Sequence, residues 1–327
     1  MKQEQIMSLE NKVKNEYGNI AGIVVLKNDS VVYESYFNQC SENEPIHVFS
    51  VTKSIISMLF GIAIDKGYIK NLDEKVIDFF PNYKIKKREK TIQHITIKNL
   101  LTMTAPYKYK SNPYTKFFSS ADWVTSSLDL LGGSGKIGDF RYAPVIGIDI
   151  LSGILINTTG QSVLEFAQDN LFSPLKISVE KNVYFRNKEE QFDFYKSKGI
   201  NGWVADPNGT NTAGWGLSLT TMDMAKLGLL YLNKGLLYNR QIVSEKWVSE
   251  STQVQSIWET RNLKYGYLWW IIGEEDCSFA ALGDGGNAIY VNAKDKIVVA
   301  ISSLFVPRVK DRVDFIKNDI EPIFKFN

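Results

Sequence analysis

Histidine is scarce in this chain, because His47 and His94 are the only two among 327 residues. This excludes a metal site built from several histidines, and a Ser-His-Asp triad would have to recruit one of the two. Cysteine is equally scarce: Cys40 and Cys277 lie far apart, which indicates neither a disulfide framework nor a zinc cluster. If this protein is an enzyme, we expect lysine or tyrosine to move the proton, with no metal and no organic cofactor.

Long apolar segments and strong net charge are also missing. No run of about 18 uncharged apolar residues occurs, and the N-terminal sequence lacks the apolar core of a secretory signal. The 38 basic and 36 acidic side chains give a net charge of +2, with no long block of one sign. We therefore predict a folded cytoplasmic protein that acts on a small molecule, with no nucleic-acid or membrane partner. Its oligomeric state stays open.

Strand patterns gather at the two ends of the chain, and helical patterns fill the middle. The predicted end elements are a helix over 3–17, a hairpin of 21–27 and 31–37, strands over 265–272, 279–282 and 288–303, the last with a turn at 292–296, and a helix over 309–326. Helices are predicted over 50–66, 96–104, 119–131, 145–158, 162–171 and 220–233. The pattern predicts an α+β fold, an α/β sandwich whose antiparallel sheet comes from residues 1–49 and 261–327. Residues 50–260 would form a mostly helical subdomain, with the site in the cleft between the two.

The start of the helix predicted over 50–66 carries a candidate nucleophile. Ser50 and Lys53 are three residues apart and share a helix face, so the hydroxyl and the amine can meet. The rest of this helix is apolar on nearly every side, which predicts burial. Burial lowers a lysine pKa by as much as ~3–5 units, so a neutral amine could take the serine proton near pH 7. The alternative is an N-cap serine followed by a lysine that reaches solvent.

Further stretches occur in the order found in one family. They are Phe49-Ser50-Val51-Thr52-Lys53, the segment 95–104 (ITIKNLLTMT), the segment 212–217 (TAGWGL) and the segment 282–287 (LGDGGN). Over nearly its whole length the chain resembles the serine β-lactamase and DD-peptidase superfamily. The resemblance is to the class C-like branch that includes esterases, D-amino-acid peptidases and 6-aminohexanoate-dimer hydrolases. It implies a β-lactamase/transpeptidase-like fold and an acyl-enzyme formed on Ser50.

The resemblance also implies roles for two further motifs. A Tyr-x-Asn motif supplies a tyrosine that works with the lysine, and Tyr142 occupies that place, although Pro144 stands where the asparagine would be. A third motif lines the cleft with a strand, matched here by Asp284, Gly285 and Gly286, which we expect to bind substrate. The backbone N–H groups of Ser50 and Asn287 would form the oxyanion hole, with Gly286 replacing Asn287 if the alignment slips by one residue. We also expect Asn287 and Trp215 to contact the substrate.

Asp284 indicates which substrate to expect, because members of the resembled family have a cationic residue at this position. A carboxylate would repel the carboxylate of penicillins and of peptides ending in D-alanine. We therefore predict a serine hydrolase acting on a neutral ester, or on an amide or short peptide that carries an amine. The alternatives are a non-catalytic penicillin-binding sensor or scaffold, and an active β-lactamase or D-Ala-D-Ala carboxypeptidase.

Two other features are interpreted as structural. The loop 132–137 (GGSGKI) looks like part of a phosphate loop, but its first glycine is misplaced and Ile137 stands where Ser or Thr should be. His47 lies three residues before Ser50, on a segment predicted to be extended, and is a weak candidate for its base. Four tryptophans are candidates for lining an acyl pocket: Trp203, Trp215, Trp269 and Trp270.

Overall fold

The predicted antiparallel sheet is present and has eight strands. The computed structural model describes residues 2–325. The strand order is β2 (Ser30–Tyr36), β1 (Ile20–Lys27), β14 (Ile297–Ser303), β13 (Asn287–Asn292), β12 (Ser278–Gly283), β11 (Trp270–Gly273), β10 (Leu263–Tyr265), β9 (Ser256–Trp258). Every neighbouring pair is antiparallel. The α+β fold class is therefore confirmed.

The hairpin of β1 and β2 follows from its turn sequence. Lys27 pairs with Ser30, which leaves Asn28 and Asp29 as the two turn residues. Their φ angles of 49° and 65° lie in the left-handed region that a tight hairpin turn needs and that Asn and Asp tolerate. β1, β13 and β14 are buried almost throughout because helices cover both faces of the sheet.

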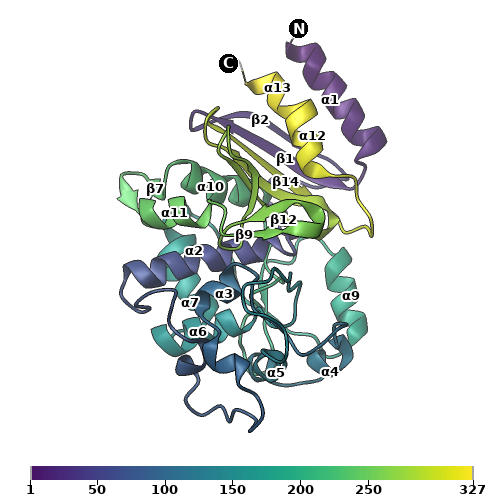
Figure 1. Ribbon diagram of the computed structural model, residues 1–327. Coiled ribbons are helices and arrows are strands. Elements are labelled where there is room, and N and C mark those ends of the chain that lie inside the picture. Colours follow the sequence, from purple (N-terminus) through teal and green to yellow (C-terminus); the bar gives the residue numbers. More distant parts are fainter. Residues whose placement is uncertain (1, 326–327) are drawn as a thin grey trace.

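The outer face of the sheet is covered by the two ends of the chain. α1 (Lys2–Glu16), α12 (Arg312–Phe315) and α13 (Glu321–Phe324) lie side by side there, and Figure 1 shows them in purple and yellow. Leu9 and Val13 of α1 and Phe315 of α12 belong to one apolar cluster with the strands. Phe326, the predicted end of the terminal helix, lies outside the described residues.

The inner face is covered by α2 (Val51–Asp65) and α10 (Thr221–Leu232). α10 packs on β1, β13 and β14, and its Gly228 allows close approach, since a Cβ there would lie 2.5 Å from Val298 Cγ1. α2 contacts β12 and β13 on one side and α6 (Ile150–Thr159) on the other. It is buried from residue 51 to residue 63 and runs between the sheet and the helical lobe (Figure 1). Part of the region 50–260, including α10 and β9, therefore packs with or belongs to the sheet.

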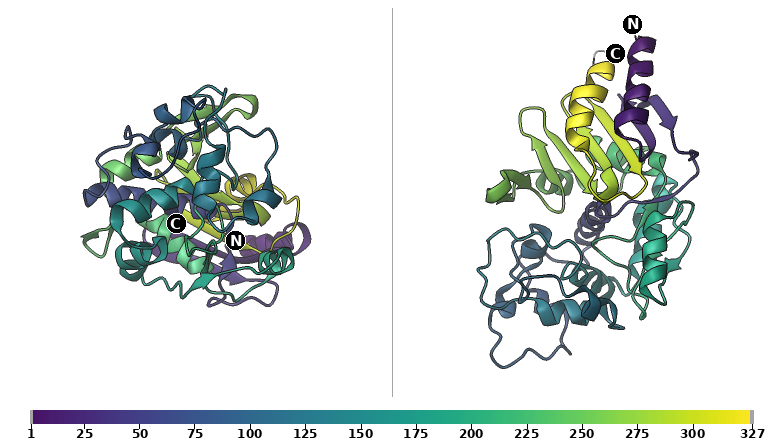
Figure 2. Two further views of the ribbon diagram at one scale, coloured as in Figure 1. Left: turned by 90° about the horizontal axis from the view of Figure 1, so that it is seen from below. Right: turned by 90° about the vertical axis from the view of Figure 1, so that its right-hand side faces the viewer.

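The helical lobe contains the remaining elements. Besides α6, its helices are α3 (Ile97–Leu101), α4 (Tyr114–Phe118), α5 (Trp123–Leu130), α7 (Val163–Ala167), α8 (Ser173–Leu175) and α9 (Lys188–Lys196). A further helix, α11 (Glu245–Ser251), lies beside the sheet. Three short ladders join β3 (Ile46–His47) to β6 (Ser218–Leu219), β4 (Asn182–Val183) to β5 (Trp203–Val204), and β7 (Leu236–Leu237) to β8 (Arg240–Gln241). Figure 2 shows this lobe beyond α2, on the side away from the chain ends. Within residues 2–325, no helix is long and apolar enough to cross a membrane.

Some predicted boundaries were wrong, each for a local reason. The helix predicted over 119–131 begins at Trp123, because Asp122 rather than Ser119 caps it by accepting from Thr125 N. The helix predicted over 145–158 begins only at Ile150, because residues 145–149 form a loop that approaches Lys53. The strand predicted over 265–272 is two strands, since the chain turns between Tyr265 and Trp270.

Candidate active site

Ser50 lies at the junction between β3 and α2. β3 pairs with β6, and Val48 N donates to Leu217 O at 2.9 Å, so the approach to the helix is fixed. Phe49 has a φ of 49°, a strained value for a bulky residue that turns the chain sharply just before Ser50. Ser50 occupies the N-cap position, but its side chain makes no capping hydrogen bond. The simple N-cap interpretation is therefore wrong, and the hydroxyl is available for other contacts.

Lys53 is buried with its amine directed at Ser50. Its Nζ lies 2.9 Å from Ser50 Oγ and 2.7 Å from the carbonyl oxygens of Pro144 and Gly214, and only 1% of the residue is exposed. Burial lowers the pKa of Lys53 to about 7, although the charges of Asp284 and Asp149 act in the opposite direction. A neutral amine has two N–H bonds, which the two carbonyls can accept, and a lone pair left to face Ser50.

The segment 212–217 contributes through its backbone at Gly214. A Cβ at this position would lie 2.7 Å from Ile148 Cγ2 and 3.1 Å from Pro144 O, so only glycine lets the carbonyl reach Lys53. Trp215, expected to contact substrate, is instead a core residue, 3% exposed and packed against other aromatic rings. It does not line the cavity at Ser50, so that prediction was wrong.

Tyr142 lines the same cavity as Ser50. Burial raises the pKa of Tyr142 to about 12, and a hydrogen bond with the Ser50 side chain partly offsets this rise. The Lys53 amine lies 5.3 Å from the centre of the Tyr142 ring. The structure thus brings together the three side chains singled out from the sequence. Pro144 has no side-chain amide, but its main-chain carbonyl holds Lys53, which explains how a proline is compatible with this position.

The segment 95–104 positions the tyrosine motif. The backbone N–H of Arg141 donates to Met103 O at 2.6 Å, and Ala143 N lies 3.4 Å from Met103 Sδ. The guanidinium of Arg141 donates to the carbonyls of Tyr107 and Tyr109. Tyr142 is therefore held between two anchored neighbours.

The third motif places the end of β12 against Ser50. A Cβ on Gly283 would lie 2.2 Å from Val48 O and 3.3 Å from Ser50 N, so glycine is required for this approach. Gly285 and Gly286 have φ angles of 77° and 90°, which a tight turn between β12 and β13 demands. Asp284, at the start of this turn, is exposed and lines the cavity with Ser50 and Tyr142.

Asn287 does not line the cavity in which Ser50 lies. Its side-chain amide donates to Asp284 O at 2.8 Å, and its Oδ1 accepts from Ser303 N at 2.9 Å. These bonds hold the turn against β14. These bonds involve the side chain, so the role of the Asn287 backbone N–H as oxyanion donor stays a prediction. Gly283 and Asp284 are the residues of the motif that line the Ser50 cavity.

The cavity at Ser50 has a volume of about 720 Å³, a size typical of small-molecule sites. Four carboxylate side chains and two basic ones line it: Glu274, Asp284, Asp311, Asp314, Arg261 and Lys264. Lys264 pairs with Glu274, and the Arg261 guanidinium lies 4.4 Å from the centre of the Trp258 ring. Of the four candidate tryptophans, Trp270 lines this cavity, whereas Trp203 and Trp269 are fully buried. The formal lining charge is negative, at 4 acidic minus 2 basic groups.

His47 and the loop 132–137 are structural, as interpreted. His47 is buried; its Nε2 accepts from Gly216 N at 3.0 Å, and burial lowers its pKa to about 3. It holds the segment that carries Gly214.

In the loop 132–137, the Gly133 N–H donates to the carboxylate of Glu89, so this backbone donor already has an anionic partner within the protein.

Asp149 is a buried carboxyl group that the sequence interpretation missed. Its Oδ1 accepts from Ala213 N at 2.7 Å, and Oδ2 has no protein partner. Burial raises the pKa of Asp149 to about 7, and Lys53 lowers it in part. An acidic residue inside the apolar run 145–151 was the available signal, because such a residue must be paired or neutral.

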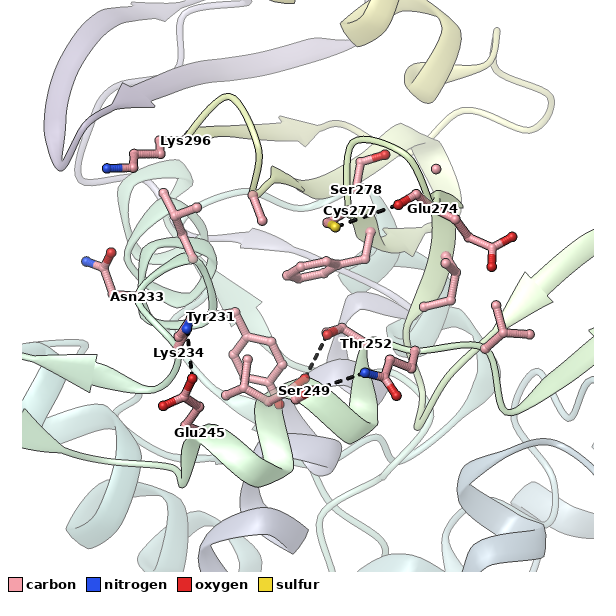
Figure 3. A pocket seen from close by; sticks show the side chains of 18 of the residues that line it. Tyr231, Asn233, Lys234, Glu245, Ser249, Thr252, Glu274, Cys277, Ser278 and Lys296 are labelled. Carbon is pink, nitrogen blue, oxygen red and sulfur yellow. Dashed lines mark hydrogen bonds and ion pairs between the residues drawn. The ribbon is translucent and has the colours of Figure 1, made fainter.

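A cavity of larger volume than the one at Ser50 lies elsewhere. Figure 3 shows this space of about 880 Å³, lined by residues of α10, α11, β11 and β12. Lys234 pairs with Glu245 at 2.7 Å, Thr252 Oγ1 donates to Val248 O, and Ser278 Oγ donates to Asp276. No serine there faces a buried base. Among residues 2–325, no group of three or more His, Cys, Asp or Glu side chains could hold a metal ion. The Ser50 cavity is therefore the candidate active site.

Known proteins share this fold and sequence pattern. A protein of Alkalihalophilus pseudofirmus is 26% identical over 263 residues, which cover 77% of this chain and 70% of that protein. The 6-aminohexanoate-dimer hydrolase of Paenarthrobacter ureafaciens is 22% identical over 303 residues, 86% of this chain and 71% of the relative. A solved family VIII carboxylesterase superposes with a TM-score of 0.73 at 14% identity, covering 97% of this chain and 96% of its own.

A penicillin-binding protein homologue from Caulobacter crescentus gives a TM-score of 0.71 at 14% identity, covering 93% of this chain and 92% of that one. The family model described as Beta-lactamase matches residues 11–317, which includes Ser50, Lys53, Tyr142 and the turn at Asp284. The chain belongs to the beta-lactamase family.

Proposed function

We propose that this protein is a serine hydrolase that cleaves a neutral ester, or an amide whose substrate carries an amine, through an acyl-enzyme on Ser50. The observation that carries the proposal is the buried Lys53 amine, which lies 2.9 Å from Ser50 Oγ and has a pKa of about 7. A base is most effective when its pKa is near the working pH. The hydrolase activities of the relatives named above are consistent with this chemistry.

The proposed reaction begins with transfer of the Ser50 hydroxyl proton to the Lys53 amine. Ser50 Oγ bonds to the substrate carbonyl carbon, and the oxyanion accepts hydrogen bonds from Ser50 N–H and from the backbone at Gly283–Asp284. Tyr142 passes the proton from Lys53 to the leaving group as the bond to that group breaks. Water then attacks the acyl carbon and gives one proton to Lys53. As the bond between that carbon and Ser50 Oγ breaks, Lys53 returns this proton to Ser50 Oγ, and the acid is released.

The lining charge supports the proposed substrate class. Asp284 is close enough to Lys53 to raise its pKa, so a substrate carboxylate bound beside Ser50 would meet this negative charge. Asp311 and Asp314 add to it on the same wall. Attraction between unit charges ~4 Å apart is worth ~1 kcal/mol in water and more in a cleft. A leaving group that carries an amine is therefore favoured over a β-lactam or a peptide carboxylate.

The test compares the wild-type protein with the Ser50→Ala variant. p-Nitrophenyl esters of graded acyl length are supplied, product release is followed, and intact mass is recorded within the first turnovers. We expect hydrolysis and a transient acyl adduct in the wild type, and neither in the variant. Nitrocefin, a chromogenic β-lactam that carries a carboxylate, should be hydrolysed poorly. Equal rates for the two proteins, with no adduct on Ser50, would contradict the proposal and favour a non-catalytic binding role.

A further inference from the structure

A second cavity lies beside the catalytic serine, on the side of the helical lobe. It has a volume of about 660 Å³, and its walls come from α4, α9 and the loop that follows Tyr142. Seven of the 16 lining residues are aromatic: Tyr114, Phe118, Trp123, Tyr184, Phe185, Phe192 and Tyr195. The basic groups at this cavity have other contacts, since Arg186 pairs with Glu190 and Lys188 lies over the Phe192 ring. The interior is therefore suited to an apolar group.

Two consecutive residues place this cavity next to the Ser50 cavity. Val145 lines it, whereas Pro144, the next residue back along the chain, lines the Ser50 cavity and bonds Lys53. On the other side, the ring of Tyr195 packs 5.6 Å from that of Phe49, the residue before Ser50. The charge of Asp284 also acts on the hydroxyl groups of Tyr114 and Tyr195. The aromatic cavity is therefore a neighbour of the acidic cavity that Ser50 lines, with Pro144 and Val145 between the two.

The position of Tyr142 decides which half of a substrate enters each cavity. Tyr142 lines the acidic cavity and not the aromatic one. The group that passes the proton to the leaving group must face that leaving group. With the leaving group on the Tyr142 side, the acyl group points the other way, past Val145.

We propose that the aromatic cavity binds the acyl group of the substrate and selects large apolar acyl groups, such as arylalkanoyl groups, over acetyl. This inference rests on the proposed function for its orientation of the substrate. The occupant is part of the molecule that Ser50 attacks, because this cavity adjoins the one that Ser50 lines and because aromatic walls desolvate apolar groups favourably. The volume is ample for a phenyl ring on a short chain.

The first test varies only the acyl group. p-Nitrophenyl acetate and p-nitrophenyl 4-phenylbutyrate share one leaving group, so the ratio of their kcat/KM values reports acyl recognition. We expect the wild type to prefer 4-phenylbutyrate by about 10-fold or more, the range that pocket contacts typically give. The Val145→Phe variant, which narrows the cavity, should reduce that ratio about 10-fold. The same substitution in the acidic cavity, Val313→Phe, should leave the ratio unchanged.

A second variant guards against misfolding near Lys53. Thr115 lines the opposite wall on α4 and is exposed, so Thr115→Trp fills the cavity without touching the backbone at Pro144. It should lower the ratio in the same direction as Val145→Phe. If both variants retain the wild-type ratio, or if the wild type prefers acetate, the acyl-cavity proposal is wrong.

The last measurement separates this inference from the proposed function. Trp123 lies in the cavity wall, so 4-phenylbutyramide binding to the Ser50→Ala protein can be followed by tryptophan fluorescence. We expect saturable binding that Thr115→Trp abolishes, and none with acetamide. Binding without ester turnover would support the cavity and refute the hydrolase. Ester turnover without acyl preference or amide binding would support the hydrolase and refute the cavity.

Discussion

The acidic cavity that Ser50 lines and the aromatic cavity next to it differ in origin and in chemistry. The acidic cavity is built mainly from strands β9 to β12 and the start of α12, with carboxylates at Asp284, Asp311 and Asp314. The aromatic cavity is built from α4, α9 and neighbouring loops of the helical lobe. The sheet side supplies charge, and the lobe supplies apolar surface.

Ser50 and Lys53 lie at the start of α2, which runs between the sheet and the lobe. Ser50 precedes the helix and lines the acidic cavity, whereas α2 is buried from residue 51 to residue 63, Lys53 included. The same burial that stabilises the helix removes water from Lys53 and lowers its pKa. One helix therefore provides both the structural centre of the protein and the proposed base.

The largest expected effect comes from replacing Lys53, the proposed base, because it acts whatever groups occupy the two cavities. In Lys53→Met, an apolar side chain of similar length replaces the amine, and kcat/KM should fall by about 10²- to 10⁴-fold for every acyl and leaving group. The wild-type kcat/KM should rise with pH through about 7, because only the neutral amine accepts the serine proton. Rate–pH profiles of both proteins check this. A variant that retains the acid limb of the profile would show that another group is the base.

The Tyr142→Phe substitution should affect only the departure of the leaving group. Without the hydroxyl, proton delivery to a poor leaving group is lost, so ethyl ester hydrolysis should fall by about 10- to 10²-fold. p-Nitrophenolate leaves without a proton, so p-nitrophenyl esters should show a smaller loss. Steady-state rates on ethyl and p-nitrophenyl 4-phenylbutyrate measure the contrast. If the rates on the ethyl and p-nitrophenyl esters fell equally, Tyr142 would not be the group that delivers the proton to the leaving group.

Asp284→Asn should weaken the charge preference of the acidic cavity. The choline ester and the 3,3-dimethylbutyl ester of one acid have leaving groups of the same shape but differ in charge. We expect the ratio of kcat/KM for the choline ester to that for the neutral ester to be about 5-fold lower in the variant, which corresponds to ~1 kcal/mol for an exposed charge pair. This difference between the two proteins should be smaller at high salt. The acid limb of kcat/KM should also move to lower pH, because Asp284 raises the pKa of Lys53. An unchanged ratio would mean that Asp284 does not contact the leaving group.

The smallest effect on catalysis is expected from Asp149→Asn, which should instead change stability. The pKa of Asp149 is raised from 3.8 to about 7 in the folded protein, so the folded state holds its proton more tightly. Its contribution to stability is therefore present below about pH 4 and is lost as the pH rises towards 7. The asparagine variant keeps an acceptor for Ala213 N–H and has no carboxyl group to ionise.

Urea unfolding of the wild type and of Asp149→Asn between pH 4 and pH 8 tests this directly. The free-energy difference in favour of the variant should be smallest near pH 4 and should grow up to about pH 7. A difference that does not change with pH would indicate that only packing, and not ionisation, distinguishes the two side chains.

The motifs of the sequence predicted which candidate side chains lie close together better than they predicted the surroundings of those side chains. Ser50 and Lys53 are three residues apart on a helix, so their contact is a local consequence of helix geometry. Tyr142 could be placed only by resemblance, because its distance from Ser50 depends on the anchoring of the loop by Met103. Trp215 was misjudged, since an aromatic residue in a motif can face the core as readily as a cavity.

The sequence by itself determined the elements that depend on local patterns: the buried helix α2, the hairpin turn at Asn28 and Asp29, and a sheet made from both chain ends. The tertiary structure alone decided how Lys53 is held, because the Pro144 and Gly214 carbonyls come from segments 91 and 161 residues away. It alone revealed Asp149 beside the lysine and the aromatic cavity beside the serine. Backbone carbonyls and cavity walls have no sequence signature, since every residue has a carbonyl and only packing aims it at a partner.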